Sequence, residues 1–218
     1  MPTLSDRPAG HPSAIDLPYI DPVPLTPGPA PFDDPEWLFE PKYDGLRALI
    51  YSSRQGCEIR LPGEVLFERT TELRDRVAKV LGGREAILDG MVVALNRRGK
   101  PGFRELFRGL GYLAFAASDL LWLDGRDLRG LPLIERKNLL TELLPEDTGP
   151  LYKILTLREH GRALFSAASK MELAGIVAKR QSESYGPETV WYQIGNPGYS
   201  GSEAGMRGSG EVGTRVIG

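Results

Sequence analysis

The sequence predicts an α+β fold in which mostly antiparallel sheets are flanked by helices, and three observations support this. Short β-rich runs recur along the chain, and the stretches between them carry apolar residues at helical spacing. The order of the two kinds of run is not the strict alternation of a doubly wound parallel sheet. A chain of 218 residues with 41% hydrophobic and 26% charged residues is also long enough to bury one good-sized core.

The predicted strands and helices follow one another in the body of the chain. Strands are predicted at residues 46–52, 58–61, 86–95, 113–123, 175–180 and 190–194. Helices are predicted at residues 71–81, 133–144 and 159–172, with a short one at residues 102–108. The first helix has apolar residues at positions 73, 77, 80 and 81, and Gly82-Gly83 follows it as a stop signal.

Proline and glycine content predicts where the folded body begins and ends. Residues 1–35 hold ten prolines, which rule out long helices and favour a Pro-rich extended arm. From residue 198 onward the sequence is rich in glycine and serine, with few apolar residues, and predicts a flexible tail. We therefore expect an arm at residues 1–35, a folded domain at residues 36–197 and a tail at residues 198–218.

Composition excludes several classes of protein. A single cysteine, Cys57, cannot form an internal disulfide, and with only two histidines the chain lacks the residues for a zinc cluster. The chain has neither a long apolar run nor the apolar core of a signal peptide, so we expect a cytoplasmic protein with no membrane partner. A net charge of −2 argues against indiscriminate nucleic-acid binding through overall charge, and a local basic patch stays open.

Residues 39–47 carry the strongest chemical signal. They place Lys42 between Glu40 and Asp44, with Gly45 and Arg47 close behind. A lysine amine attacks phosphorus only in its neutral form, and nearby charges set how much of it is neutral. We expect Lys42 to lie directly before the first strand, in a tight turn that Asp44-Gly45 permits. From spacing alone, a surface turn whose side chains face water explains the stretch equally well.

Residues 40–47, Glu-Pro-Lys-Tyr-Asp-Gly-Leu-Arg, resemble motif I of the covalent nucleotidyltransferases, in particular the adenylation domain of ATP-dependent DNA ligases of the bacterial end-joining type. Further segments resemble the same domain in order: residues 87–95 its motif III, residues 118–137 the strand and loop that follow, residues 174–180 its motif IV, and residues 196–200 its closing segment. The likeness covers about residues 20–200. It implies an ATP-grasp-like nucleotidyltransferase domain, and we expect no OB-fold after it in this chain.

The resemblance also implies a reaction and a set of site residues. In the family, the motif I lysine attacks the α-phosphorus of ATP, and the resulting AMP passes to a DNA 5′-phosphate and is displaced by a 3′-hydroxyl. By resemblance, Lys42 is the catalytic nucleophile, Glu40 and Arg47 hold the adenine and the sugar, and Lys179 lies near phosphate. The implied cofactor is ATP with Mg²⁺ or Mn²⁺. The implied partners are nicked or broken duplex DNA and DNA end-joining proteins, at the bacterial nucleoid if the chain binds DNA.

Four positions that are charged in the family are neutral in this chain. Met91 and Ala174 replace the carboxylates of motifs III and IV, and Gln193 and Gly195 replace the lysines of the last motif. A thioether and a methyl group cannot hold magnesium, which takes oxygen ligands. We expect that Asp89 cannot substitute, because neighbouring residues of a strand face opposite ways. No metal-ligand set is therefore predicted.

Two functions are open at this point. One is a working or weakened ATP-dependent DNA ligase domain, and the other is a pseudoenzyme that keeps the fold as a nucleotide-, DNA- or protein-binding module. We favour the second for activity, because removing one positioned group commonly costs about a hundredfold in rate. An accidental Lys-x-Asp-Gly is disfavoured, since several motifs occur in order. RNA ligases and capping guanylyltransferases share the fold plan, but the segment after residue 119 resembles end-joining ligases more closely.

Overall fold

The computed structural model describes residues 15–61, 70–96, 110–145 and 149–199, together with Gly99, Pro101 and Leu106. These residues form two sheets, which we call sheet A and sheet B. Across sheet A the strands run in the order β1 (Leu25–Pro27), β11 (Trp191–Gly195), β10 (Gly175–Arg180), β2 (Asp34–Pro41) and β9 (Leu157–Glu159). Across sheet B they run β4 (Gly56–Arg60), β3 (Leu46–Ser53), β5 (Ala86–Leu95), β6 (Tyr112–Leu123) and β7 (Arg126–Asp127), with β8 (Leu151–Lys153) also paired to β6.

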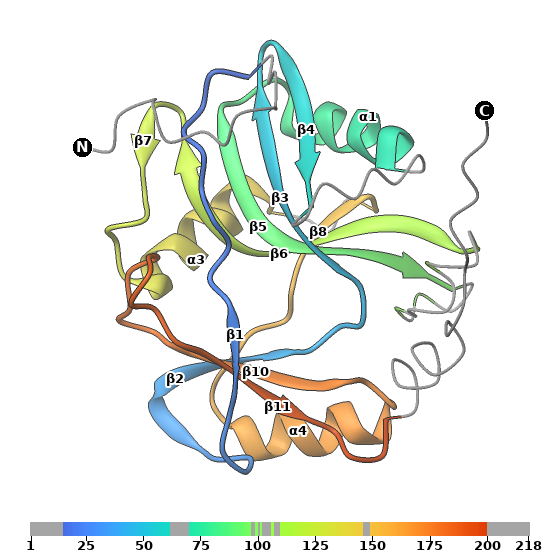
Figure 1. Ribbon diagram of the computed structural model, residues 1–218, viewed down its shortest axis with the longest axis vertical. Helices are drawn as coiled ribbons and strands as arrows, with labels where there is room; N and C mark the ends of the chain where they lie inside the picture. Colours follow the sequence, from blue (N-terminus) through green and yellow to red (C-terminus); the bar gives the residue numbers. More distant parts are fainter. Residues whose placement is uncertain are drawn as a thin grey trace, which may run out of the picture.

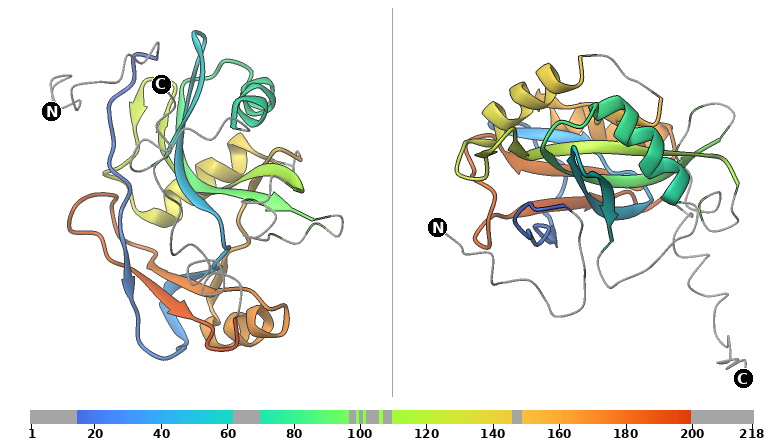
Figure 2. Two further views of the ribbon diagram at one scale, coloured as in Figure 1. Left: turned by 45° about the vertical axis from the view of Figure 1, so that its right-hand side comes forward. Right: turned by 90° about the horizontal axis from the view of Figure 1, so that it is seen from above.

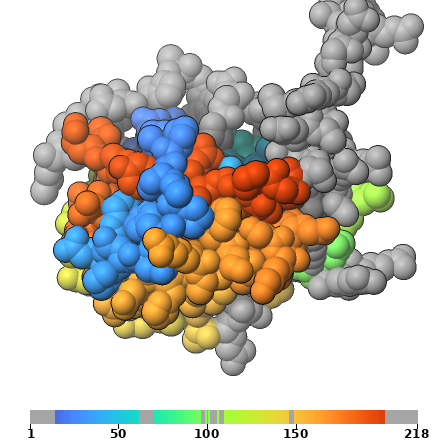
Figure 3. All heavy atoms as spheres, turned by 90° about the horizontal axis from the view of Figure 1, so that it is seen from below, coloured from blue at the N-terminus to red at the C-terminus, as the bar shows by residue number. Residues whose placement is uncertain are grey.

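Three helices, α1 (Thr70–Leu81), α3 (Leu133–Leu143) and α4 (Gly161–Lys170), cover the outer faces of the sheets. Helices α1 and α3 pack on one face of sheet B, and α4 packs on sheet A (Figure 1). Seen from below, α4 lies at the surface in orange beside the blue N-terminal strands (Figure 3). Only the β1–β11 and β6–β8 pairs are parallel among the described strands, so the predicted α+β fold with mostly antiparallel sheets is confirmed.

The N-terminal segment helps to fill the space between the two sheets. Residues 15–24 run extended from sheet B to sheet A before β1 begins (Figures 1 and 2). They bury Ile15, Leu17, Ile20 and Val23 in a cluster that contains residues of β3, β5, β6, β10 and β11. The backbone N–H of Ile20 donates to the hydroxyl of Tyr51 at 3.0 Å. Much of the predicted arm is therefore part of the fold, and its boundary at residue 35 falls inside β2.

Most of the predicted elements are present within one or two residues of their expected bounds. Helix α1 buries Leu73, Val77 and Leu81 and is followed by Gly82 and Gly83, both with positive φ, as the spacing indicates. Helix α4 begins later than expected, because β9 occupies residues 157–159. The short helix predicted at residues 102–108 lies outside the described residues except for Leu106, and the tail after residue 199 lies outside them entirely.

Lys42 lies in the connection that leads into the predicted strand at residues 46–52, which is present as β3, but that strand is not the first of the chain. Strand β2 ends at Pro41, so Lys42 lies in the connection from β2 of sheet A to β3 of sheet B. Strand propensity does not predict β2, because the strand has prolines near both ends and three acidic residues, Asp34, Glu36 and Glu40. This placement matters for function, because the connection between the two sheets lies at the edge of the space that they enclose.

No helix of the described residues is long and apolar enough to cross a membrane.

Candidate functional site

A pocket between the two sheets brings together all four site residues that the sequence indicates. Glu40 comes from the end of β2, Lys42 from the connection after it, Arg47 from β3 and Lys179 from β10. The remaining lining comes from β1, β2, β5, β6, β10, β11 and two connecting segments: Leu25, Pro41, Tyr43, Gly90, Met91, Ser118, Ile154, Val177 and Trp191. Residues about 140 positions apart in the chain thus meet in one place.

The Lys42 connection is held by backbone contacts on both sides. The Lys42 N–H donates to the carbonyl of Gly175 at 2.8 Å. A Cβ at Gly45 would lie 2.4 Å from the carbonyl oxygen of Val92, so the glycine is required by close packing against β5. Partial burial lowers the pKa of Lys42, and Asp44 opposes that effect. A lower pKa increases the fraction of the amine that is in the neutral form, which is the form that attacks phosphorus.

At the inner end of the pocket two lysines share one carboxylate. We call Glu40, Lys137 and Lys179 the buried lysine cluster. The Lys179 ammonium lies 2.7 Å from Glu40 Oε2, and the Lys137 ammonium from α3 contacts Oε1. Ser118 Oγ donates to Oε2 at 2.9 Å, and Lys179 donates to Ser118. All four residues are buried.

The charges in this cluster set its protonation. Burial alone would raise the pKa of Glu40, but Lys137 and Lys179 outweigh it and lower that pKa to about 2. Burial lowers the pKa of Lys179 to about 8, with Glu40 opposing the change and Lys137 adding to it. The carboxylate is therefore ionised at neutral pH, and it is the only carboxylate that both lysines contact directly; Asp119, which is paired with Arg136, acts on Lys179 from farther away.

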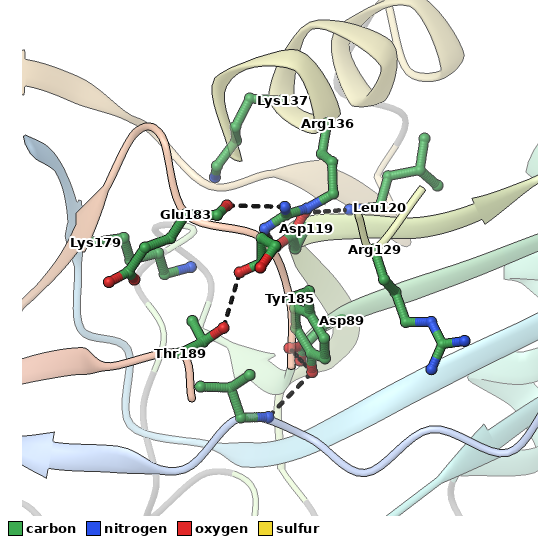
Figure 4. A network of polar contacts seen from close by, with 12 residues as sticks. Asp89, Asp119, Leu120, Arg129, Arg136, Lys137, Lys179, Glu183, Tyr185 and Thr189 are labelled. Carbon is green, nitrogen blue, oxygen red and sulfur yellow. Dashed lines mark hydrogen bonds and ion pairs between the residues drawn. The ribbon is translucent and has the colours of Figure 1, made fainter. Parts of the chain in front are cut away.

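Arg47 is fixed by a second, partly buried contact, with the fully buried Asp89 of β5. Its Nε and Nη2 donate to the two Asp89 carboxylate oxygens, each at 2.5 Å. The Tyr185 hydroxyl donates to Asp89 at 2.8 Å and accepts from the Val23 N–H at 3.1 Å (Figure 4). Burial disfavours the charge on Arg47, but Asp89 raises its pKa above the ordinary value. A chain of contacts thus runs from the N-terminal segment to the pocket.

The expectation that Asp89 faces away from the site is wrong. Asp89 and Met91 are two positions apart on β5, so their side chains lie on the same face of the strand. Arg47 is the cross-strand partner of Met91 and reaches diagonally to Asp89. Asp89 is therefore a site residue, but both of its oxygens are already occupied by Arg47 and Tyr185.

Trp191 forms an aromatic wall for the cations of the pocket. The Lys179 ammonium lies 3.8 Å from the centre of its ring and the Arg47 guanidinium 5.1 Å from it. Cations near the face of an indole ring are attracted by its quadrupole. Positions 193 and 195 share the same side of β11 as Trp191, since residues alternate along a strand, but their residues are Gln193 and Gly195.

The side chains present do not fit a divalent metal ion. Magnesium takes oxygen ligands, and protein sites offer it one or more free carboxylates. Here Glu40 and Asp89 are held by cations, Asp44 accepts a hydrogen bond from Tyr199 at 2.6 Å, and Met91 offers no oxygen. Among the described residues, no group of three His, Cys, Asp or Glu side chains could hold a metal.

Sequence reasoning gave no site role to Lys137 or Tyr185. A signal for Lys137 was present, because α3 buries Leu133, Arg136, Lys137 and Leu140, which are spaced as one helical face. Basic residues at core positions of a helix need partners inside the protein. Arg136 finds one in Asp119, with both side chains 0% exposed and contacts of 2.9 and 2.8 Å (Figure 4).

Comparison with known proteins gives consistent results. Residues 30–194 match the family model described as "ATP dependent DNA ligase domain". The multifunctional non-homologous end joining protein LigD of Pseudomonas aeruginosa is 35% identical over 160 residues, covering 69% of this chain and 19% of that protein. The LigD of Mycobacterium tuberculosis H37Rv is 32% identical over 155 residues, covering 70% of this chain and 20% of that protein. The chain thus spans about a fifth of the length of these relatives.

Solved structures show the same likeness. The ligase domain of M. tuberculosis LigD superposes with a TM-score of 0.70 at 28% identity, covering 80% of this chain and 58% of that one. A mycobacterial DNA ligase D in complex with ATP also gives a TM-score of 0.70 at 28% identity, covering 80% of this chain and 60% of that one.

Proposed function

Because the chain belongs to the ATP-dependent DNA ligase domain family, and to its bacterial end-joining type, we propose that it is a nucleotidyltransferase domain of DNA strand joining with little or no ligation activity. In this proposal Lys42 keeps the position of the nucleophile. Glu40, Arg47 and Lys179 keep the positions that hold a nucleotide. The pocket has lost the groups that would speed the chemistry.

One observation carries the proposal: among the described residues, the acidic side chains at and beside the pocket, Glu40, Asp44 and Asp89, are all engaged by other side chains. Attack by a neutral Lys42 amine on the α-phosphorus of ATP forms a nitrogen–phosphorus bond, expels pyrophosphate and releases a proton from the amine. Negative charge builds on the leaving group, and its stabilisation is usually the largest catalytic contribution. Met91 and Ala174 supply no carboxylate for a metal, and Gln193 and Gly195 supply no cation for it.

An alternative function is a non-catalytic module that binds a nucleotide, DNA or another protein. The buried lysine cluster favours the nucleotide, because its two ammonium groups face one carboxylate beside the pocket. The relatives are named as end-joining proteins, which supports broken duplex DNA as the partner of a longer assembly. ATP is the nucleotide that the family model names.

Covalent labelling tests the proposal. The protein is incubated with ATP radiolabelled at the α-phosphorus, with Mg²⁺ or with Mn²⁺, and separated by denaturing electrophoresis. Lys42→Ala removes the nucleophile, and Lys170→Ala on exposed α4 is the control. We expect slow labelling of a small fraction of the chains. Rapid labelling of most chains that disappears in Lys42→Ala would overturn the proposed loss of activity.

A nick-sealing assay on duplex DNA tests the later steps separately. We expect no sealed product within the time in which an active DNA ligase seals all of the substrate. Sealing by this chain alone at a comparable rate would contradict the proposal, whatever the extent of labelling.

A further inference from the structure

We propose that the pocket binds a nucleoside monophosphate through its own cationic side chains and without a divalent metal ion. This inference rests on the proposed function, since it assumes that the pocket still receives a nucleotide. It departs from the metal-dependent chemistry that the family implies, and it names the ligand class that the altered pocket fits.

The first argument is the surplus positive charge in the buried lysine cluster. Lys137 and Lys179 have side chains only 10% and 2% exposed, and the two share the single carboxylate of Glu40. A buried charge without a full counter-charge is costly, so an anion beside it would be stabilised. Lys179 lines the pocket, so its ammonium group is the part of the cluster that a bound anion would contact.

The second argument concerns the charges around the rest of the pocket. Its lining holds three cationic side chains, Lys42, Arg47 and Lys179, and one carboxylate, Glu40. The immediate partners of these side chains are Lys137, Asp89 and Asp44. Four cations therefore face three carboxylates. A divalent cation entering this site would add to an existing positive surplus, and repulsion opposes its binding.

The third argument concerns the carboxylates themselves. A metal at Asp89 would compete with Arg47, which holds both oxygens at 2.5 Å, and with Tyr185, which donates at 2.8 Å. A metal at Glu40 would compete with Lys137 and Lys179. Weakening either set of contacts would leave a partly or fully buried cation with less of its counter-charge, which is unfavourable. The charges of this pocket thus favour binding of a nucleotide phosphate and oppose binding of a metal ion.

The size of the ligand charge follows from these arguments. A phosphomonoester carries about −1.5 to −2 charges at neutral pH, which side-chain cations can neutralise. A triphosphate carries more charge and normally brings a metal that is held by both phosphates and carboxylates. Since Gln193 and Gly195 supply no further cations, we expect AMP to bind more tightly than ATP.

Isothermal titration calorimetry on the full chain tests the inference. AMP, ATP and adenosine are titrated in EDTA and again in millimolar Mg²⁺. We expect the Kd for AMP to agree within about twofold between the two buffers and to be at least about tenfold lower than that for adenosine or ATP, since charge-assisted hydrogen bonds strengthen phosphate binding.

A matched pair of variants locates the anion site. Lys179→Met removes the surplus charge and leaves Glu40 paired with Lys137, whereas Lys170→Met removes an exposed lysine of α4. We expect the first to weaken AMP binding by about 10- to 100-fold and the second to leave it unchanged. Thermal denaturation checks that Lys179→Met is folded, and the EDTA and Mg²⁺ comparison needs no variant.

The outcomes separate this inference from the proposed function. An AMP or ATP affinity that rises more than about tenfold in Mg²⁺ overturns the inference, and so does the absence of AMP binding at millimolar concentration. Equal AMP affinity in Lys179→Met and the unchanged chain also overturns it. None of these results bears on the loss of ligation, which rapid labelling of Lys42 or efficient nick sealing would overturn.

Discussion

Replacing Glu40 with glutamine removes the only carboxylate of the buried lysine cluster at almost constant volume. In the folded protein Glu40 is 2% exposed, and the two lysines hold its pKa at about 2, compared with an ordinary value of 4.5. Each pH unit of this difference corresponds to about 1.4 kcal/mol, so the ionised carboxylate contributes about 3 kcal/mol at neutral pH. We therefore expect Glu40→Gln to lower the free energy of unfolding by about 3 kcal/mol and the Tm by about 6–12 °C.

The pH dependence gives this prediction a specific signature. Because the folded-state pKa lies below the unfolded one, the contribution of Glu40 is present above pH 4.5 and is lost as pH falls toward 2. At high pH the variant recovers, since Lys179, whose pKa is already lowered to about 8, can release its proton when Glu40 is absent. The stability difference should therefore be greatest between about pH 5 and 7 and smaller on both sides.

Urea denaturation measured from pH 3 to 9 checks the prediction, with Glu36→Gln as the control. Glu36 lies on the same strand, its side chain is 69% exposed, and it is 3.5 Å from Arg180. An exposed pair of this kind contributes less than about 1 kcal/mol. Equal losses in the two variants, or a Glu40→Gln loss that does not change with pH, would refute the reasoning about the cluster.

Two further predictions concern the core and the Lys42 connection. Asp119→Asn should lower the free energy of unfolding, measured by urea denaturation, by about 3–5 kcal/mol, because it leaves Arg136 charged and buried. The control Asp124→Asn, at an exposed pair, should lower it by less than about 1 kcal/mol, and similar losses in the two variants would contradict the argument. Gly45→Ala should sharply reduce both the yield of folded protein and its nucleotide binding, because the new Cβ would lie 2.4 Å from a carbonyl oxygen. Gly130→Ala, which has open space around it, should be tolerated, and normal calorimetric binding by Gly45→Ala would contradict the close packing.

The sequence predicts well those elements whose own residues carry the signal. Strands β5 and β10 have the predicted bounds, since long runs of apolar and β-branched residues mark them. The local sequence does not predict strand β2, because its apolar centre is flanked by proline and acidic residues, and its place between β10 and β9 makes it a strand. Its position in the sheet, more than its local sequence, defines it.

The site shows the same division. Glu40, Lys42, Arg47 and Lys179 were identified through a resemblance, and the fold places all four at one pocket. Which carboxylate pairs with which cation was not predictable, because each pair joins strands or helices far apart in the chain. Lys137 meets Glu40 across 97 positions, and that distance is closed only by the packing of α3 on sheet B. These pairings, which engage both Glu40 and Asp89, could be read only from the structure.

The central claim of the proposed function is that Lys42 keeps the position of the nucleophile and that four neutral residues prevent it from reacting. Met91, Ala174, Gln193 and Gly195 are all partly or fully exposed, so charged side chains can be introduced there without burying them completely. The most direct test is the rate of Lys42 labelling by radiolabelled ATP and Mg²⁺ in a chain carrying Met91→Glu, Ala174→Glu, Gln193→Lys and Gly195→Lys.

This rate is compared with that of the unchanged chain, and circular dichroism confirms that both are folded. We predict labelling at least about a hundredfold faster in the restored chain, with the label lost on adding Lys42→Ala. Equal labelling rates in the two folded chains would contradict the claim.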